Sequence, residues 1–324
     1  MTLDGGLVMA RYGPDGGVDW IPSSGDGVVA SVPASYAAFV LAGRRARTFH
    51  VLCGDVSGGE VLTIRADEGG LTVLDARRTF GAEPCHAAIV GDDRLVVANY
   101  ESGTVSIFDL DETGIPVRGP EIVELSGSGP DPVRQRGPHP HFVLAGFGGH
   151  DAIVVDLGSD ALWSLDRDAD GWHVATFAEL EPGAGPRHVV VADGSLIVSG
   201  ELDGTVTVVD EAGNVVSSVA ATSIGADGPA YPGDVARVPG GVVVAIRGRS
   251  SVSVLTRDAG TVAVEREVAI PGSWPQQLLS DGRRLLVVDR DGGRILDLDP
   301  ETGAWTEEIT GLRAPMWAVR VEAV

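Results

Sequence analysis

Residues 84–109 read PCHAAIVGDDRLVVANYESGTVSIFD, and this stretch shows the unit from which the fold is built. A proline is followed by polar residues and an apolar run, and a turn of Gly and Asp leads to a second run, Arg94–Asn99. Another turn leads to a third run, Thr104–Phe108. Short runs rich in Val and Ile between such turns are typical of β-strands. The stretch therefore predicts successive short strands and no helix.

The same unit recurs along the chain. Its proline is found at seven places, which are Pro33, Pro84, Pro140, Pro186, Pro232, Pro275 and Pro315. Successive prolines are 51, 56, 46, 46, 43 and 40 residues apart. A period of roughly 40–50 residues with several strands in each repeat is typical of β-propeller blades. We therefore predict an all-β chain folded as a seven-bladed β-propeller.

The last repeat is incomplete, because only nine residues follow Pro315. Residues 6–12 are strand-like, and we expect this N-terminal strand to complete the last blade and to close the ring, which removes exposed strand edges. Because part of a ring could not bury its own faces, residues 1–324 are predicted to form a single domain. Residues 125–137, rich in Gly, Pro and Ser, are expected to be a long loop between blades.

Composition narrows the classes of partner. The 324 residues include 46 acidic and 24 basic ones, all of the basic ones Arg, and the formal net charge is −22. The lack of lysine excludes Schiff-base chemistry and a P-loop lysine, and the acidic balance argues against nucleic acid or an anionic membrane as partner. No apolar run reaches the roughly 18 residues of a membrane-spanning helix, and residues 1–11 do not resemble a signal peptide. Cys53 and Cys85 are expected to be free thiols in a cytoplasmic protein.

Polar residues gather directly after the prolines. In a propeller the first strand of each blade lines the central channel, so these positions meet at one mouth, where a pocket can draw on several blades. The turn after the second strand adds further polar residues, among them Arg290. The predicted substrate-binding residues are His86, His139, His188, Asp234, Gln276 and Tyr100.

Four residues from three consecutive blades form the candidate catalytic set: His141, Arg187, Glu201 and Arg247. An imidazole is the natural general acid or base near neutral pH, and a guanidinium suits a carboxylate, a phosphate or a developing oxyanion. Glu201 has three candidate roles, which are to orient an arginine, to hold the histidine tautomer or to activate water. The alternative is that all four are buried polar residues that join one blade to the next.

Two other arrangements point to different chemistry. His139 and His141 alternate along a strand and have the spacing of a metal-ligand pair, but no third ligand stands at a matching place, so no metal is expected. Cys85 and His86 have the residue types of a nucleophile and a base. As neighbours in a strand they point to opposite faces, so they are not expected to act together.

Together, in this order and at this spacing, the motifs resemble the seven-bladed lactonase family, which includes bacterial propeller-type 6-phosphogluconolactonases and the fungal 3-carboxy-cis,cis-muconate lactonising enzyme. The resemblance covers residues 30–324. It rests on Pro84–His86 with Val97–Gly103, Gly137–His141 with Asp156–Asp160, Gly185–His188 with Glu201–Leu202, Tyr231–Asp234 with Arg247–Gly248, and Trp274–Pro275. Gly200 stands where the family has Asn before Glu-Leu, and Ala245–Ile246 where it has Ser-Asn before Arg-Gly. These departures bear on the substrate more than on the fold.

The resemblance implies that the candidate catalytic set matches the family's active-site His, Arg, Glu and Arg, and that no metal or other cofactor is needed. It implies a hydrolase of carbohydrate metabolism, a 6-phosphogluconolactonase-like lactonase, whose partner is a small-molecule lactone or anionic sugar acid. Water deprotonated by His141 or Glu201 would attack the ring carbonyl. Arg187 would stabilise the oxyanion, and Arg247 would hold a carboxylate or phosphate. Two alternatives stay open: a cycloisomerase that closes a carboxymuconate-type substrate with His141 as proton donor, and a non-catalytic binding propeller.

Overall fold

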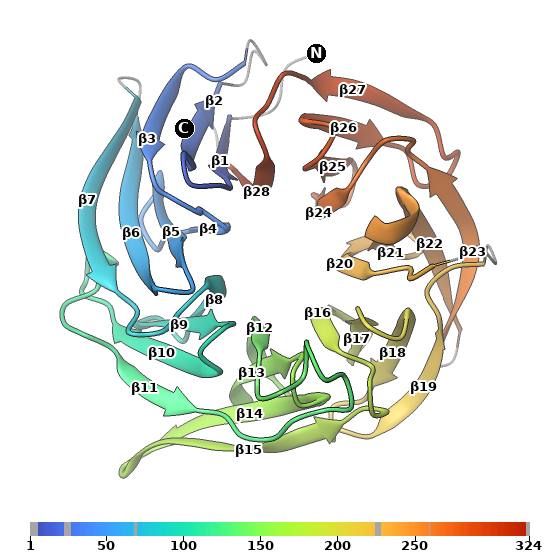
Figure 1. Ribbon diagram of the computed structural model, residues 1–324, viewed down its shortest axis with the longest axis horizontal. Helices are drawn as coiled ribbons and strands as arrows, with labels where there is room; N and C mark the ends of the chain where they lie inside the picture. The colour runs from blue at the N-terminus through green and yellow to red at the C-terminus, as the bar shows by residue number, and fades with distance from the viewer. Residues whose placement is uncertain (1–5, 23–26, 68–69, 224–227, 259, 322–324) are drawn as a thin grey trace.

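The computed structural model describes residues 6–22, 27–67, 70–223, 228–258 and 260–321. Within these ranges 28 β-strands form seven four-stranded sheets, and the helical content is one 3-10 turn, η1 (Arg247–Arg249). The sheets stand around a central channel as the blades of a propeller (Figure 1). The predicted all-β, seven-bladed β-propeller is confirmed. No helix among the described residues is long and apolar enough to cross a membrane.

Six blades are antiparallel sheets of four consecutive strands. Their strands are β4 (Phe39–Ala42), β5 (Thr48–Asp55), β6 (Gly58–Asp67) and β7 (Gly70–Arg78); β8 (Pro84–Val90), β9 (Arg94–Asn99), β10 (Thr104–Asp109) and β11 (Glu121–Glu124); β12 (Pro140–Phe147), β13 (His150–Asp156), β14 (Ala161–Asp168) and β15 (Gly171–Glu179); β16 (Pro186–Ala192), β17 (Ser195–Gly200), β18 (Thr205–Val209) and β19 (Val215–Ala220); β20 (Pro232–Val238), β21 (Gly241–Ile246), β22 (Ser251–Asp258) and β23 (Thr261–Ala269); and β24 (Pro275–Ser280), β25 (Leu285–Asp289), β26 (Arg294–Leu298) and β27 (Trp305–Ile309). The first strand of each blade lies nearest the channel (Figure 1).

The two ends of the chain share the seventh blade. Its strand order is β28 (Pro315–Arg320), β1 (Leu7–Arg11), β2 (Gly17–Ile21) and β3 (Ala30–Pro33). In the antiparallel register Val8 faces Val319 on one side and Trp20 on the other, so β1 is paired along both edges. The predicted closure of the ring by the N-terminal strand is confirmed.

One of the seven prolines does not occupy the place that its spacing predicts. The last six each begin a strand beside the channel, whereas Pro33 is the last residue of β3, the outer strand of the closing blade. Because β3 is an edge strand, a residue without an N–H group costs no ladder hydrogen bond there. Tyr36, three residues later, lies in the connection to β4 with a φ of 55° and does not begin a channel strand.

Neighbouring blades are held together by apolar side chains on both faces of each sheet. One buried cluster, for example, joins Ile197 and Val206 of one blade to Val235 and Val244 of the next. Because both faces are covered, the middle strands read as continuous apolar runs. The expected loop is present between β11 and β12, and Gln135, only 1% exposed, fastens it. The Gln135 Nε2 donates to the Leu157 carbonyl oxygen at 2.9 Å and to Asp160 Oδ1 at 2.7 Å.

Candidate active site

A β-bulge follows the proline at the start of six channel strands. The register with the neighbouring strand of the blade shifts after Pro84, Pro140, Pro186, Pro232, Pro275 and Pro315. A bulge leaves residues outside the ladder and re-aims their side chains. The polar residues that follow the prolines in sequence fall in these bulges, so the repeat places them together around the channel.

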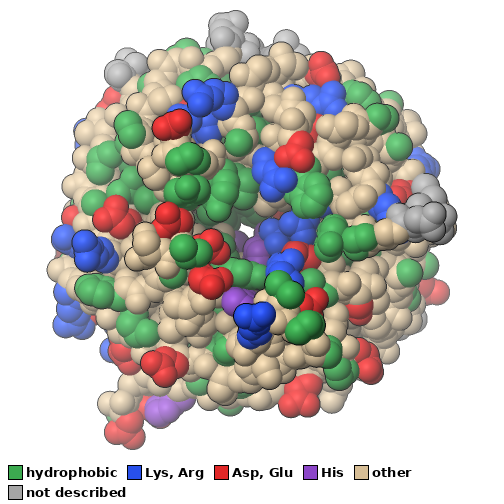
Figure 2. All heavy atoms as spheres, viewed as in Figure 1, with side chains coloured by type: hydrophobic (Ala, Val, Ile, Leu, Met, Phe, Trp, Pro, Cys, Tyr) green, Lys and Arg blue, Asp and Glu red, His purple; other side chains and the backbone are tan. Residues whose placement is uncertain are grey.

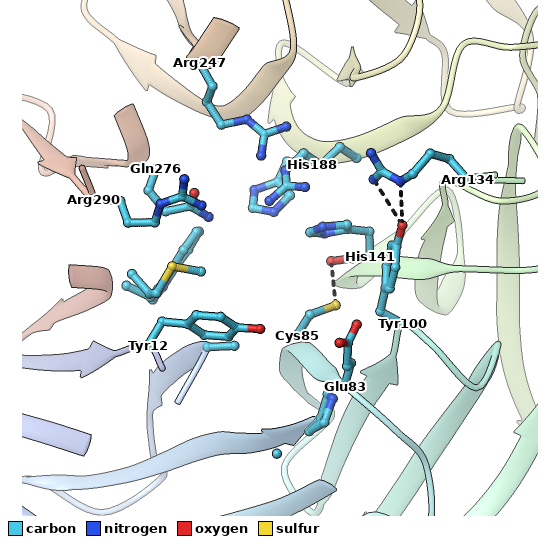
Figure 3. A pocket seen from close by; sticks show the side chains of 16 residues that line it. Tyr12, Glu83, Cys85, Tyr100, Arg134, His141, His188, Arg247, Gln276 and Arg290 are labelled. Atoms are coloured by element: carbon cyan, nitrogen blue, oxygen red, sulfur yellow. Dashed lines mark hydrogen bonds between the residues drawn. The ribbon is translucent and has the colours of Figure 1, made fainter. Parts of the chain in front are cut away.

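A cavity of about 370 Å³ lies among these bulges. Figure 2 shows the face of the molecule that opens onto it, with a central hollow in which histidine and arginine side chains are visible. The polar side chains that line the cavity are Tyr12, Glu83, Cys85, Tyr100, Arg134, His141, Arg187, His188, Arg247, Gln276 and Arg290. Figure 3 shows ten of them converging from different blades.

Six of the ten predicted site residues line this cavity: His141, Arg187, Arg247, Tyr100, His188 and Gln276. Glu201 lies behind the wall and bonds to its arginines. The other three predicted substrate-binding residues lie elsewhere. His86 and Asp234 line a separate cavity, and His139 lies in a surface pocket beside the loop that precedes β12.

One carboxylate organises the arginine wall. Glu201 Oε2 lies 2.6 Å from Arg187 Nη1 and 2.7 Å from Arg247 Nη2, and Oε1 lies 3.0 Å from Arg134 Nη2. Glu201, Arg187 and Arg247 are 4%, 8% and 6% exposed, so little water screens these pairs. Three guanidinium groups against one carboxylate leave two positive charges beside the cavity. A guanidinium has five N–H donors, so donors remain for an anionic ligand.

The electrostatics follow from this packing. Burial alone would raise the pKa of Glu201, but Arg187 and Arg247, helped by Arg134, together hold it well below its ordinary value. Burial and the neighbouring charge of Arg187 lower the pKa of Arg247 to about 10. The carboxylate therefore stays ionised near neutral pH. Both of its oxygens are engaged, and this fits the first of the candidate roles of Glu201, which is to orient arginines.

The His141 and His188 rings are neighbours in the cavity wall, with centroids 5.3 Å apart. Burial, followed by the charge of Arg187, lowers the pKa of His141 well below its ordinary value. Burial also lowers the pKa of His188, although its hydrogen bond to Asp234 opposes that shift. Both imidazoles are therefore neutral near pH 7, the state in which one ring nitrogen donates a hydrogen bond and the other accepts one.

The three predicted residues outside the cavity are supports. Asp234 Oδ1 accepts a hydrogen bond from His188 Nδ1 at 2.8 Å. His86 is stacked on Phe142 at 3.7 Å and accepts a hydrogen bond from the backbone N–H of Val143, so it belongs to the packing that closes the channel. His139 stacks on Tyr100 at 4.6 Å and shares a 2.8 Å hydrogen bond with its carbonyl oxygen.

The alternative chemistries of these segments gain no support from the geometry. Within the described ranges no group of three or more His, Cys, Asp or Glu side chains stands close enough to hold a metal ion. Cys85 faces the cavity and His86 the separate cavity, as expected for neighbours in a strand. Burial raises the pKa of the Cys85 thiol to about 12, which keeps it protonated and unreactive.

A family model described as "Lactonase, 7-bladed beta-propeller" matches residues 33–319. The chain belongs to this family. The 6-phosphogluconolactonase of Bacillus subtilis is similar to it, with 30% identity over 263 residues, or 75% of this chain and 74% of that relative. The 6-phosphogluconolactonase of Formosa agariphila is 29% identical over 140 residues, or 41% of this chain and 40% of that one.

Solved structures agree on the fold. The periplasmic gluconolactonase of Pseudomonas aeruginosa has a TM-score of 0.85 at 19% identity, covering 98% of this chain and 99% of its own. The fold of the propeller lactonases is therefore retained at low sequence identity. The expectation of an enzyme of the lactonase type, a hydrolase, is confirmed by the family and its 6-phosphogluconolactonase relatives.

Three polar cavity residues of this lactonase, Arg134, Tyr12 and Glu83, were missed from the sequence, whereas Arg290 is one of the polar turn residues expected at the mouth. Arg134 lies in the loop before β12, and its Nε and Nη2 donate to the Tyr100 hydroxyl at 3.2 and 3.1 Å. The length of that loop is the available signal, because long connections without secondary structure are usually functional or disordered. Tyr12 and Arg290 line the opposite side of the cavity from Arg134, and Glu83 lies beside Cys85 and Tyr100 (Figure 3). Glu83 directly precedes a repeat proline, whereas the polar positions that the repeat predicts at the mouth follow the proline or the second strand.

Buried neutral histidines make the stability of this lactonase depend on pH. The pKa values of His50, His86, His141 and His188 are lowered by burial, that of His50 to about 4. As the pH falls through about 6.5, the unfolded chain takes up protons at these residues before the folded chain does. We expect the thermal midpoint to fall steadily from pH 7.5 to pH 5. A flat midpoint over this range would contradict the prediction.

Proposed function

We propose that this chain hydrolyses a small, anionic, sugar-derived lactone and is 6-phosphogluconolactonase-like. The observation that supports this most is the wall of three guanidinium groups around Glu201, which leaves two positive charges beside a cavity that also holds two neutral histidines. A phosphate or carboxylate matches that charge, and relatives named 6-phosphogluconolactonase fit the same substrate class. In a chain of formal net charge −22, this local positive site also attracts small anions.

The three arginines of the wall are assigned two different roles. Arg247 and Arg134 hold the anionic group of the substrate, and Arg187 meets the oxyanion that forms when water attacks the ring carbonyl. A preorganised donor of this kind stabilises the transition state without reorganisation, because Glu201 already fixes the guanidinium groups. Since both Glu201 oxygens are engaged by arginines, we assign the proton transfers to the histidines. As the water oxygen bonds to the carbonyl carbon, the carbonyl π electrons move to oxygen. When the C=O bond re-forms, the ring C–O bond breaks, and the proton taken from water returns to the ring oxygen to give the hydroxy acid.

No cofactor is assigned to this reaction. The cavity wall carries an excess of positive charge, which repels a cation, and Arg187 supplies the charge stabilisation that a Lewis acid would supply. Carbohydrate metabolism in the cytoplasm is the predicted setting, although one structural relative is a periplasmic enzyme. The predicted partner is the small molecule alone, without nucleic acid or membrane.

The proposal is tested by following lactone opening in a pH-stat near pH 7, with spontaneous hydrolysis subtracted and products identified by NMR. The panel contains 6-phosphogluconolactone, gluconolactone and a muconolactone, each with and without EDTA. We expect EDTA-resistant opening of the phosphorylated sugar lactone. Closure of a carboxymuconate to a lactone would instead establish a cycloisomerase, and no turnover of any substrate would favour a binding propeller.

A further inference from the structure

We propose that His188 is the general base of the site, that Asp234 is the positioning residue that sets its tautomer, and that His141 is a hydrogen-bond donor to the substrate. The inference deepens the proposed function and rests on it. It gives the two histidines separate roles, and it assigns one to the buried Asp234, which lies outside the main cavity.

Asp234 holds His188 in one tautomer. Three N–H groups converge on the Asp234 carboxylate: His188 Nδ1 at 2.8 Å and the backbone N–H of Val235 at 2.9 Å on Oδ1, and the backbone N–H of Leu278 at 2.8 Å on Oδ2. An ionised carboxylate only accepts hydrogen bonds, so the proton of the neutral imidazole is on Nδ1. Asp234 is 5% exposed and belongs to β20, while its partners come from β16, β20 and β24. Three neighbouring strands of the channel therefore fix its direction.

The other nitrogen of His188 is the one that reaches the cavity. His188 is part of the cavity wall, and Figure 3 shows its ring between Arg247 and His141. Its Nε2 has no hydrogen-bond partner among the described residues, and it is not one of the fully buried polar atoms. With the proton on Nδ1, Nε2 presents a lone pair to whatever occupies the cavity. That is the arrangement of a base oriented by a carboxylate.

His141 has the opposite arrangement. Its Nδ1 is buried and has no partner among the described residues. A buried N–H group without an acceptor is rarer and costlier than a buried lone pair, so the proton of this neutral imidazole belongs on Nε2. Arg187 and Arg247 oppose a second proton, so the ring stays neutral. His141 Nε2 is then a donor, suited to the carbonyl oxygen of a lactone and not to deprotonating water.

The charged surroundings of His188 are compatible with a base at neutral pH. The charged and titratable groups around it are Asp234, Arg187, Arg247, His141 and His86. Burial lowers the pKa of His188, its hydrogen bond to Asp234 raises it, and Arg187 and Arg247 lower it. Phe142 and Trp317, with ring centroids 5.0 and 5.6 Å away, complete its contacts with aromatic rings.

The resulting reaction is balanced. His188 Nε2 accepts a proton from water as the water oxygen bonds to the lactone carbonyl carbon. The carbonyl electrons move to oxygen, which accepts hydrogen bonds from Arg187 and from His141 Nε2. When the C=O bond re-forms, the bond to the ring oxygen breaks, and the His188 imidazolium returns its proton to that oxygen. Lactone and water thus give one hydroxy acid, and His188 ends neutral.

The test uses Asp234→Asn and ¹⁵N NMR of histidine-labelled protein. The amide has one oxygen for the three N–H groups of Leu278, Val235 and His188, so the carboxylate that fixes the imidazole proton on Nδ1 is lost. Where that oxygen accepts from Leu278, the amide NH₂ faces His188 and favours the Nε2–H tautomer. In the wild type we expect His188 as the Nδ1–H tautomer and His141 as the Nε2–H tautomer. In Asp234→Asn we expect His188 to lose its exclusive Nδ1–H tautomer, with the Nε2–H tautomer populated. We also expect kcat to fall about 100-fold or more, with KM changed less than threefold, because the carboxylate also stabilises the imidazolium that forms. Because NMR needs no substrate, the tautomers of His188 and His141 can be determined even if no lactone is turned over.

A matched control is Asp166→Asn. His150 Nδ1 and Asp166 Oδ2 form a His–Asp pair at 2.7 Å that is not part of the cavity wall and is more exposed, with side chains 32% and 42% exposed, so kcat should not change. His188→Gln retains Asp234 and should remove the acidic limb of the kcat/KM profile. A folded Asp234→Asn protein with kcat within threefold of wild type, or a wild-type His188 with its proton on Nε2, would overturn the proposal. If Asp234→Asn does not fold, an acidic limb retained in His188→Gln would overturn it.

Discussion

We expect Glu201→Gln to lower the free energy of unfolding by about 3–5 kcal/mol and to abolish turnover, because it leaves the buried Arg187 and Arg247 and the partly exposed Arg134 without their common counter-charge. In the native protein the Glu201 carboxylate lies within 2.6–3.0 Å of all three arginines. The amide of glutamine keeps the shape, but it cannot balance their mutual repulsion. Urea unfolding at pH 7 measures the loss of stability, and lactone turnover measures the loss of function.

Glu307→Gln is the matched control, since Glu307 also pairs with an arginine, Arg294 at 2.6 Å, but its side chain is 46% exposed. That substitution should lower the free energy of unfolding by about 0–1 kcal/mol.

The pKa of Glu201 is held below its ordinary value of 4.5, so its stabilising contribution is present above about pH 4.5 and is lost as the pH falls further. The gap between wild type and Glu201→Gln should therefore narrow in acid. A stable, active Glu201→Gln protein would contradict the assigned role.

Arg187→Ala lowers kcat about 100- to 1000-fold, the usual effect of removing one donor from an oxyanion site. Arg187 is 8% exposed and fixed by Glu201 at the cavity wall, so water would replace it without its charge or its orientation. Arg187→Lys should recover little, because an ammonium cannot serve the Glu201 carboxylate and a substrate oxygen with the same planar fork. Steady-state kinetics on the phosphorylated sugar lactone provide the measurement.

Arg118→Ala removes an arginine that also pairs with a carboxylate, that of Asp109, but its side chain is 74% exposed. Arg118→Ala should leave kcat unchanged.

The kinetic constants distinguish the two possible roles of Arg187. A substitution that raises KM alone removes binding made equally in the ground state and the transition state, whereas loss of an oxyanion donor lowers kcat and kcat/KM together. Unchanged kcat in Arg187→Ala would show that this arginine does not act on the transition state.

The fold could be predicted because its signal is repeated. Six of the seven prolines begin channel strands, and the shortened last repeat correctly indicates that an N-terminal strand closes the ring. Spacing alone could not place Pro33, because a proline at an outer edge strand and one at an inner strand satisfy the same period. Because an open ring would expose a strand edge, the incomplete repeat after Pro315 predicted that a strand from elsewhere in the chain completes the last blade.

Only those residues of the candidate site that occupy equivalent positions in the repeats could be predicted. The residues after each proline that begins a channel strand fall in a β-bulge, so their position in the repeat predicts that His141, Arg187 and Gln276 line the cavity. Arg134 enters from a loop that follows no repeat, and its approach to Glu201 depends on how that loop packs. His188 lines the main cavity and Asp234 a separate one, although the two are hydrogen-bonded. This difference depends on the direction of each bulged side chain, which the sequence does not show.

The central claim is that the arginine wall around Glu201 makes this a site for anionic sugar lactones. It is tested most directly by wild-type kcat/KM for 6-phosphogluconolactone and for gluconolactone, measured in a pH-stat with spontaneous opening subtracted. Two charge-assisted hydrogen bonds of roughly 1.5–3 kcal/mol each predict a preference of about 100-fold or more for the phosphorylated lactone. Equal constants, or a preference for the uncharged lactone, would contradict the claim.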